Sequence, residues 1–424
     1  MKYLRIVFVL LFVTSCSKQN NRLTNPNDYD SYLKTSATKT TSKYFELWNS
    51  KIEADSTQLL SFSNVAAEYN RYFKNTGDIT YLKKAERALT KAVDIANLGK
   101  ASYARALARN YISQHRFKEA LQMAEMANQN GGGKKDTQAL LFDIHMELGN
   151  YASAEKYLDS IKNMADFGYL IRNAKWNDYQ GNLETTITFM EKALEKAESS
   201  NNKRLKIWSY TNLADYYGHA GRIQDSYNGY LKALKLDPSN AYAKKGIAWI
   251  VFSYEKNAKE ALRILDAVTE NYNSPDYYVL KAEIHEFLND AQSALKNRDA
   301  YHSLVQNPNY GEMYNSYNID YYLDCNPNYS LALDIALKEV ENRPTAESFS
   351  FLAKTYAKMN ELDKALNIVE TQIIGNTFEP GILLNVAEIY KLNGQYNKVK
   401  KLKEELEEAT YELGPVSEQT IKML

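Results

Sequence analysis

Hydrophobic residues recur at helical spacing along most of this 424-residue chain. The clearest stretch is WSYTNLADYYGHAGRIQDSYNGYLKALKLDP, residues 208–238. Its first half places Leu213 and Tyr217 on one helical face, and Gly221 interrupts that run. A second apolar face follows and stops at Pro238. The stretch therefore predicts two helices joined by a tight turn, which is a helical hairpin.

A small residue recurs in the second helix of such hairpins at intervals of 32 to 40 residues. Two helices cross at a short distance only where a methyl group or less lies between them, so this position predicts a close contact inside each hairpin. A single hairpin leaves other apolar faces uncovered, and neighbouring hairpins must stack to bury them. We therefore expect one continuous solenoid. The recurring positions are Ala85, Ala120, Ala154, Thr186, Ser226, Ala261, Ala294, Ala332, Ala365 and Val399.

This pattern resembles the tetratricopeptide repeat (TPR), a 34-residue unit with an aromatic, a Leu, a Tyr, a turn Gly, a small residue and a closing Pro. The resemblance implies an all-α fold, a right-handed α–α superhelix (TPR solenoid) of about ten helical hairpins. We assign residues 43–414 to it and residues 415–424 to a C-terminal tail. Gly and Asn enter the left-handed conformation easily, as the hairpin turn requires. The turn residues are Gly149, Gly181, Gly221, Gly394, Asn289 and Asn360.

The first residues form a different pattern, LRIVFVLLFVTSC. Lys2 and Arg5 precede eight unbroken apolar residues, 6–13. A membrane-spanning helix needs about 20 apolar residues, so this run is too short to cross a bilayer. A positive start, a short apolar run and small residues before a cleavage point are typical of a signal peptide, which we place at residues 1–15.

The signal ends on a cysteine, and VTSC resembles the end of a bacterial lipoprotein signal. The resemblance implies that Cys16 becomes the acylated first residue of the mature chain and anchors it in a membrane. By the same analogy Ser17 suits transport to the outer membrane, with a periplasmic or a cell-surface face left open. An ordinary secretory signal with an incidental Cys16 is the alternative.

Residues 16–42 are rich in Asn, Ser, Thr and Lys and show no apolar period. Such a composition does not bury enough surface to offset its ordering entropy, so we expect a flexible tether from Cys16. The whole chain carries 52 Lys plus Arg against 52 Asp plus Glu. This balance argues against an electrostatic nucleic-acid partner.

Motifs for catalysis or metal binding are missing from the sequence. NGGGKKD, residues 130–136, lacks the spacing and the Ser or Thr of a phosphate-binding loop. Neither His145 nor His285 completes an HExxH motif, and Cys325 has no accompanying base motif. We therefore expect no enzyme, no metal site and no cofactor.

Stacked hairpins produce an extended concave surface lined by the first helices, and in this family that groove commonly holds a peptide or a helix of a partner protein. The register of the core positions predicts which side chains face the groove. Exposed Trp and Tyr contribute strongly to protein interfaces, and charged residues set register. Ordinary surface or inter-unit packing is the alternative for each. The predicted partner-binding residues are Arg105, Arg109, Asp143, Trp208, Asp215, Tyr242, Lys245, Trp249, Tyr254 and Tyr317.

One tyrosine stripe permits two interpretations. Tyr310, Tyr314, Tyr317 and Tyr321 share a helical face. If the extra residues before Ala332 lie between units, the last three tyrosines face the groove. If those residues lie in the turn at DCNPN, the stripe is core. We favour the core, because Asp320 would otherwise occupy a buried small-residue position.

These observations favour a lipid-anchored scaffold that binds a protein or peptide partner in the bacterial envelope for assembly, secretion or maintenance. A nutrient or glycan-capture outer-membrane lipoprotein, with Trp208 and Trp249 as stacking platforms, is the second hypothesis. The chain has no long stretch outside the repeats to form a separate ligand-binding region, which counts against it.

Overall fold

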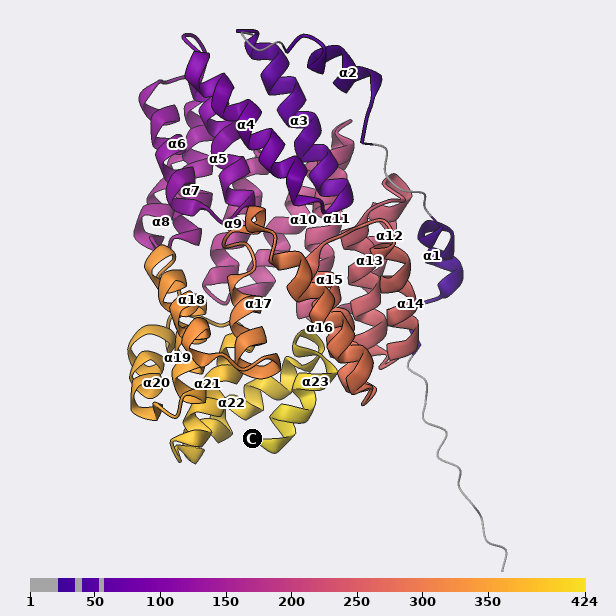
Figure 1. Cartoon of the computed structure of the whole chain (residues 1–424), viewed down its shortest axis with the longest axis vertical. Helices are drawn as coiled ribbons and strands as arrows, with labels where there is room; N and C mark the ends of the chain where they lie inside the picture. The colour runs from indigo at the N-terminus through magenta and orange to yellow at the C-terminus, as the bar shows by residue number, and fades with distance from the viewer. Residues whose placement is uncertain (1–21, 35–39, 53–56) are drawn as a thin grey trace, which may run out of the picture.

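The computed structural model of this chain describes residues 22–34, 40–52 and 57–424. Within these ranges the regular elements are all helical and no β-strand occurs, which confirms the all-α prediction (Figure 1). The signal segment and Cys16 lie outside them. The α-helices are α1 (Pro26–Leu33), α2 (Lys43–Asn49), α3 (Leu59–Thr76), α4 (Ile79–Ile95), α5 (Lys100–Ser113), α6 (Phe117–Gln129), α7 (Lys134–Glu147), α8 (Tyr151–Ser160), α9 (Phe167–Tyr179), α10 (Leu183–Ser199), α11 (Lys203–His219), α12 (Ile223–Leu236), α13 (Ala241–Trp249), α14 (Ala258–Thr269), α15 (Pro275–Phe287), α16 (Ala291–Val305), α17 (Asn315–Asp320), α18 (Tyr329–Asn342), α19 (Ala346–Lys358), α20 (Leu362–Ile368), α21 (Pro380–Leu392), α22 (Tyr396–Glu408) and α23 (Thr410–Met423). The π-helical turns are η1 (Ile250–Tyr254), η3 (Tyr321–Cys325) and η4 (Val369–Ile373), and η2 (Pro308–Tyr310) is a 3₁₀ turn.

Ten consecutive hairpins, here called units 1 to 10, run from α3 to α22. The ten predicted small positions are all buried, with at most 2% of each residue exposed, so they lie at the helix crossings as expected. The second helix of one unit packs against the first helix of the next, which makes the stack continuous. The units are α3–α4, α5–α6, α7–α8, α9–α10, α11–α12, α13 with η1 and α14, α15–α16, α17 with η3 and α18, α19 with α20 and η4, and α21–α22.

The hairpin turns of every unit except unit 8 contain a left-handed residue, and the six predicted from the sequence are among them. The four predicted glycines have φ angles between 69° and 76°, and Asn289 and Asn360 have φ angles of 58° and 61°. A residue without a β-carbon, or one with a short polar side chain, adopts this conformation at low cost. The turns of units 1, 2 and 6 use the same conformation at Gly77, His115 and Lys256.

The superhelix returns onto itself, so early units touch late ones. In a simple solenoid each repeat contacts only its neighbours. Here the backbone N–H of Asn273, after unit 6, donates to the carbonyl of Thr76 in unit 1 over 2.8 Å. Ile79 and Leu82 of unit 1 also share a core with Tyr310, which follows unit 7. The described part of the chain is therefore closed through contacts far apart in sequence.

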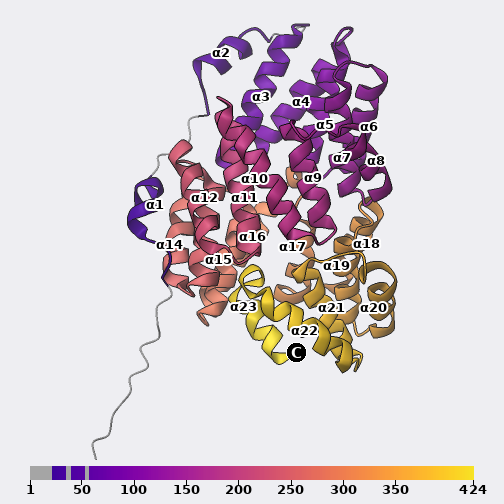
Figure 2. The same cartoon turned by 180° about the vertical axis from the view of Figure 1, so that it is seen from behind.

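These long-range contacts follow a constant offset. The turns of units 1 to 4, and the end of α11 in unit 5, meet the segment that follows the unit five places later. A β-carbon on Gly149 would lie 2.8 Å from the Pro344 carbonyl, and one on Gly181 would lie 2.6 Å from the Phe378 ring. Turns without side chains permit this approach. In both views units 8 to 10, orange to yellow, lie directly against the earlier units (Figures 1 and 2).

The segment predicted as a flexible tether is partly docked. Residues 22–34 include α1, which begins with a cap from the Asn25 side chain and a proline in its first turn. Tyr29 is 1% exposed and its hydroxyl donates to Glu260 over 2.8 Å, on α14. The structure differs from the prediction here because one buried tyrosine, rather than an apolar period, holds the segment.

The C-terminal residues expected as a tail are also structured. They belong to α23, which contacts α11, η1, α15 and α21. At Gly414 a φ of 80° and a ψ of 169° interrupt the helix before Pro415. The hydroxyl of Ser253 donates to the Tyr411 carbonyl over 2.6 Å, and Ile421 is 1% exposed. This segment has no counterpart in the repeat, so the repeat pattern does not predict where it packs.

Candidate protein-interaction surface

The ten predicted partner-binding residues all lie on first helices of the units or on the turn that continues one. This placement agrees with the register read from the sequence, whereas contact with a partner stays a prediction. Arg105 and Arg109 lie on α5, Asp143 on α7, Trp208 and Asp215 on α11, Tyr242, Lys245 and Trp249 on α13, Tyr254 on η1, and Tyr317 on α17.

Several of these polar groups connect neighbouring first helices. Their hydrogen bonds and ion pairs form a ladder along the inner surface from unit to unit. A side chain that bridges two units contributes to stacking and has less capacity left for a partner. The ladder contacts are Asp143 with Arg172 (2.5 Å), Asp215 with Tyr242 (2.7 Å), Lys245 with Asp276 (2.5 Å) and Lys354 with Asp320 (2.7 Å).

The two predicted arginines have different surroundings. Arg105 is buried, and its guanidinium donates to the Gly132 carbonyl (2.8 Å) and to Thr137 (3.1 Å), which fixes the glycine loop before α7. Arg109 is exposed, and its guanidinium makes no hydrogen bond or ion pair with the residues that the structure describes. The surrounding protein lowers the pKa of Arg109, and the nearby charge of Arg105 lowers it further. Arg109 is therefore the arginine of this pair that solvent reaches.

The predicted aromatic residues do not form one continuous surface. Trp208 is 37% exposed and lies edge-to-face against Phe167 at 5.9 Å between ring centroids. Tyr242 is the most exposed, at 52%. The ring of Trp249 lies against α23, since a β-carbon on Gly414 would be 2.7 Å from its Cη2 atom. The chain's own last helix thus packs against the C-terminal ends of the first helices of units 5 to 7 and leaves Trp208 and Tyr242 exposed.

The tyrosine stripe is divided between core and groove. Tyr310 and Tyr321 are buried, whereas Tyr317 is 38% exposed. The extra residues lie between units 7 and 8, around η2, and not in the turn after η3. Asp320 pairs with Lys354 at 2.7 Å and is not buried. The preferred core interpretation is therefore wrong for Tyr317, because the position of the insertion, not the periodicity, decides which face it takes.

A groove of about 1660 Å³ lies at the end of the superhelix. We call it the C-terminal groove. The first helices of units 8 to 10 form its floor and α23 forms one wall. Its lining includes Asp320, Asp324, Lys354, Lys358, Glu379, Glu388, Leu392, Tyr396, Leu413, Val416 and Met423.

The charges of the C-terminal groove are unevenly paired. Lys354 reaches Asp320, and Lys358 reaches Asp324 at 2.6 Å. The carboxylates of Glu379 and Glu388 make no hydrogen bond or ion pair with described residues. Burial, then the charges of Glu412 and Asp178, raise the pKa of Glu379 to about 7. Burial likewise raises the pKa of Glu388. Lys354, Lys358 and Lys391 lie near Glu388 and partly offset this rise, but none of them pairs directly with either carboxylate.

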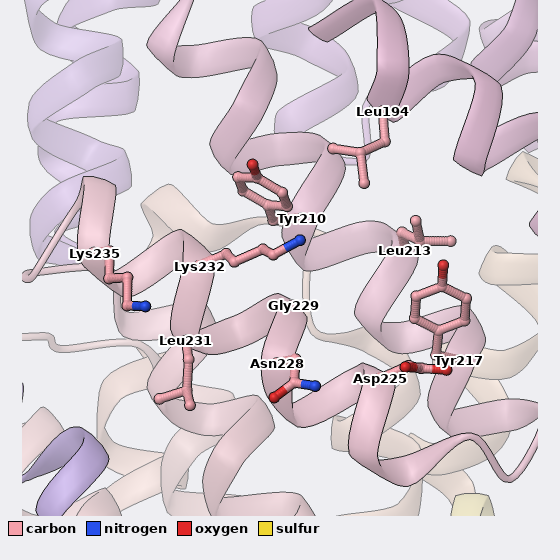
Figure 3. A pocket seen from close by; sticks show the side chains of 10 residues that line it. All are labelled: Leu194, Tyr210, Leu213, Tyr217, Asp225, Asn228, Gly229, Leu231, Lys232 and Lys235. Carbon is pink, nitrogen blue, oxygen red and sulfur yellow. The ribbon is translucent and has the colours of Figure 1, made fainter. Parts of the chain in front are cut away.

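A smaller pocket of about 330 Å³ lies between α10, α11 and α12 (Figure 3). Gly229 lets α12 pack closely on α11, since a β-carbon there would lie 2.9 Å from the Ala214 Cβ atom. Leu194 and Leu213 lie on one side of the pocket. The Lys232 ammonium lies 5.3 Å from the Tyr210 ring centroid. Burial and the hydrogen bond to Glu198 raise the pKa of Tyr210 to about 12, so the phenol is protonated at neutral pH. No sequence motif marks this pocket.

Reactive chemistry is not apparent in the described ranges. No group of three or more His, Cys, Asp or Glu side chains in them is arranged to hold a metal ion. Burial raises the pKa of the Cys325 thiol, so it is protonated at neutral pH. Among the same residues, no helix combines the length and the apolar character that crossing a bilayer requires.

No protein-family model matches the chain, and no curated relative matches it either. It is similar to solved structures of three helical proteins. A tetratricopeptide repeat protein from Parabacteroides merdae ATCC 43184 has 17% identity and a TM-score of 0.39, over 56% of this chain and 92% of that one. PilW, a type IV pilus biogenesis factor, has 15% identity and a TM-score of 0.39, over 50% and 96%. A Rap protein complexed with Competence and Sporulation Factor has 13% identity and a TM-score of 0.45, over 74% and 98%.

The class of the protein follows from its own hairpins, since these similarities are weak. Ten stacked hairpins with buried small crossing residues and left-handed turns define a superhelical repeat protein of the tetratricopeptide type.

The sequence carries a periodic charge signal for the C-terminal groove. Asp320, Lys354 and Glu388 are spaced by one repeat length, 34 residues, and occupy the same place on three successive first helices. Their charges alternate from unit to unit, and Glu388 is the last of the three. The exposed Leu392, Tyr396 and Met423 are less visible in the sequence, because their clustering depends on how α23 returns to unit 10.

Proposed function

We propose that this chain is a scaffold, anchored by lipid at Cys16 to the bacterial outer membrane, that binds a polypeptide partner in the cell envelope for assembly, secretion or maintenance. The observation that carries the binding role is the C-terminal groove. Its volume of about 1660 Å³ exceeds the range of roughly 300–1,000 Å³ for typical small-molecule pockets. Its mouth exposes Leu392 by 57% and Met423 by 68%. Clustered exposed apolar residues commonly mark protein interaction sites.

The docked segment 22–34 limits where the anchored protein would lie. At most about 20 Å of extended chain separates Cys16 from Arg22. Since α1 packs on α12 and α14, units 5 and 6 would then be the part of the superhelix nearest the membrane. The C-terminal groove belongs to units 8 to 10, so it would remain available to a partner.

Glycan capture, the second hypothesis, is less well supported. It relies on Trp208 and Trp249 as platforms for sugar rings. The Trp249 ring faces Gly414, and Trp208 contacts Phe167, so the two indoles do not offer a pair of free faces.

Site-specific photo-crosslinking in cells tests the proposal. A crosslinking residue at position 392 should trap one envelope polypeptide, whereas the same residue at 404, exposed on the outer helix α22, should not. The Cys16→Ala variant should leave the membrane fraction, and Cys325→Ala should remain in it. A protein that stays soluble in every variant, with no adduct from any position of the inner surface, contradicts the proposal.

A further inference from the structure

The C-terminal groove combines a row of alternating charges, whose last member has no ion-pair partner, with a cluster of exposed apolar side chains. Lys354 of unit 9 lies between Asp320 of unit 8, at 2.7 Å, and the last unit, which presents Glu388 at the equivalent place. In the described residues α23 follows unit 10, and none of its side chains forms an ion pair with Glu388. The ladder therefore reaches a carboxylate that makes no direct ion pair within the described residues, although Lys354, Lys358 and Lys391 lie near it.

The lysines of the groove are already engaged. Lys354 contacts Asp320 and also Asp324, at 3.4 Å, and Lys358 contacts Asp324. The Lys391 ammonium donates to the Met423 carbonyl and ties the end of α21 to α23. Glu379 and Glu388 are left without a hydrogen bond or ion pair within the described residues. Charge complementarity at this place therefore favours a cationic ligand.

The apolar end lies beyond Glu388. Leu392 at the end of α21, Tyr396 at the start of α22 and Met423 near the end of α23 are 57%, 65% and 68% exposed. At 1.5 Å per residue, Glu379 precedes Glu388 along α21 by roughly 13 Å, and Leu392 follows by about 6 Å. Along the groove the carboxylate of Glu379 therefore comes first, that of Glu388 second and the apolar cluster at Leu392 last.

We propose that the C-terminal groove binds a basic amphipathic segment of a partner polypeptide, whose Lys or Arg side chains meet Glu379 and Glu388 and whose apolar side chains cover Leu392, Tyr396 and Met423. The inference rests on the proposed function and specifies the chemistry of the partner. A cation beside Glu388 continues the ladder that Asp320 and Lys354 begin, and the apolar contacts remove exposed surface from water.

Fluorescence anisotropy with the full chain and a synthetic probe tests this. The probe is a short fluorescein-labelled peptide of Lys and Leu in an amphipathic helical pattern. Two matched peptides replace Lys by Glu or Leu by Ser. The Lys–Leu peptide should bind, and the other two should bind at least about tenfold more weakly, because each lacks one of the two complementary features.

Variants locate the binding. The double variant Glu379→Gln/Glu388→Gln should weaken binding of the Lys–Leu peptide by about tenfold or more. Glu404→Gln/Glu408→Gln, the same charge change on exposed positions of α22, should not change it. Leu392→Ser should weaken binding by about fivefold, since it removes an exposed apolar contact without disturbing the core. Equal affinity across the three variants overturns the proposal, as does equal binding of the Glu–Leu peptide.

A second copy of this chain is the other occupant to test. Sedimentation of the wild-type protein should give a monomer, and a dimer that Glu379→Gln/Glu388→Gln dissociates would overturn the proposal. Failure here is separable from failure of the proposed function. An envelope polypeptide trapped in cells from position 242 or 232, with no specific peptide binding in the C-terminal groove, leaves the scaffold function intact and removes only this inference.

Discussion

The guanidinium of Arg343 lies 3.2 Å from the carboxylate of Glu147, although the two residues are 196 positions apart. Arg343 follows unit 8 and Glu147 ends the first helix of unit 3. Arg343 also lies 5.1 Å from the Phe117 ring centroid in unit 2. Burial would raise the pKa of Glu147, but Lys175 and Arg343 together hold it below its usual value. This ion pair joins units 3 and 8, which do not contact each other through the stacking of neighbouring units.

Arg343→Ala should therefore lower the free energy of unfolding by about 1 to 3 kcal/mol, because Glu147 loses a partner in a largely buried place. Denaturant unfolding measures the change. Arg222→Ala is the matched control, since Arg222 pairs with Asp225 at the surface, and its cost should be about 0.5 kcal/mol or less. Equal losses in the two variants would show that the long-range pair does not hold the superhelix closed.

The contact of the unit 3 turn with the Pro344 carbonyl predicts a difference between two glycines. Gly149 and Gly221 have φ angles of 69° and 71°, so alanine is strained at both. A β-carbon at 149 would meet the Pro344 carbonyl at 2.8 Å, whereas one at 221 would meet nothing within 4 Å. Gly149→Ala should cost about 1 to 3 kcal/mol more than Gly221→Ala in thermal or denaturant unfolding. Equal losses of stability in the two variants would contradict the close contact between the unit 3 turn and the Pro344 carbonyl.

Docking of α23 on the concave face depends on Gly414. Gly414→Ala would place a β-carbon 2.7 Å from Trp249 at a φ of 80°, whereas Gly375→Ala, at a φ of 81°, meets nothing within 4 Å. We expect Gly414→Ala to expose Trp249 and shift its fluorescence to longer wavelength. The same substitution in a Trp249→Phe protein, which lacks this indole, is the reference and should show no shift. Gly375→Ala should leave the emission unchanged. An unchanged spectrum in Gly414→Ala would contradict the docking.

Glu283 should make stability depend on pH. Burial raises its pKa to about 7, and Lys245 opposes this only in part. Because the folded state holds the proton more tightly than the unfolded state, this stabilisation is complete below about pH 4.5 and is lost as the pH rises through about 7. The free energy of unfolding of Glu283→Gln, relative to that of the wild type, should therefore rise by about 2 kcal/mol between about pH 5 and about pH 8. Glu404→Gln should show no such trend, and a pH-independent Glu283→Gln difference would reject the raised pKa.

The repeat was predictable from sequence because its determinants are local. The small crossing residues and the left-handed turns act inside one hairpin, so a period near 34 residues reveals them. The register also placed the first-helix residues on the inner surface. Tyr317 was placed in the core because a gap in the period does not reveal where its extra residues lie.

The closure was not predictable from sequence. Contacts such as Gly149 with Pro344 join turn to connection without any periodic signal. The same holds for α1 and α23, single segments that dock through Tyr29 and Gly414 rather than through a repeat. The docking of α23 also forms one wall of the C-terminal groove, so the repeat period does not predict this groove.

Hydrogen–deuterium exchange of the full chain, with and without the Lys–Leu peptide, tests this arrangement most directly. The account predicts slower exchange in α19, α21 and α23, which enclose the C-terminal groove, and unchanged exchange in α11 and α13, where α23 already lies. Protection confined to α11 and α13, or no protection at all, would contradict it.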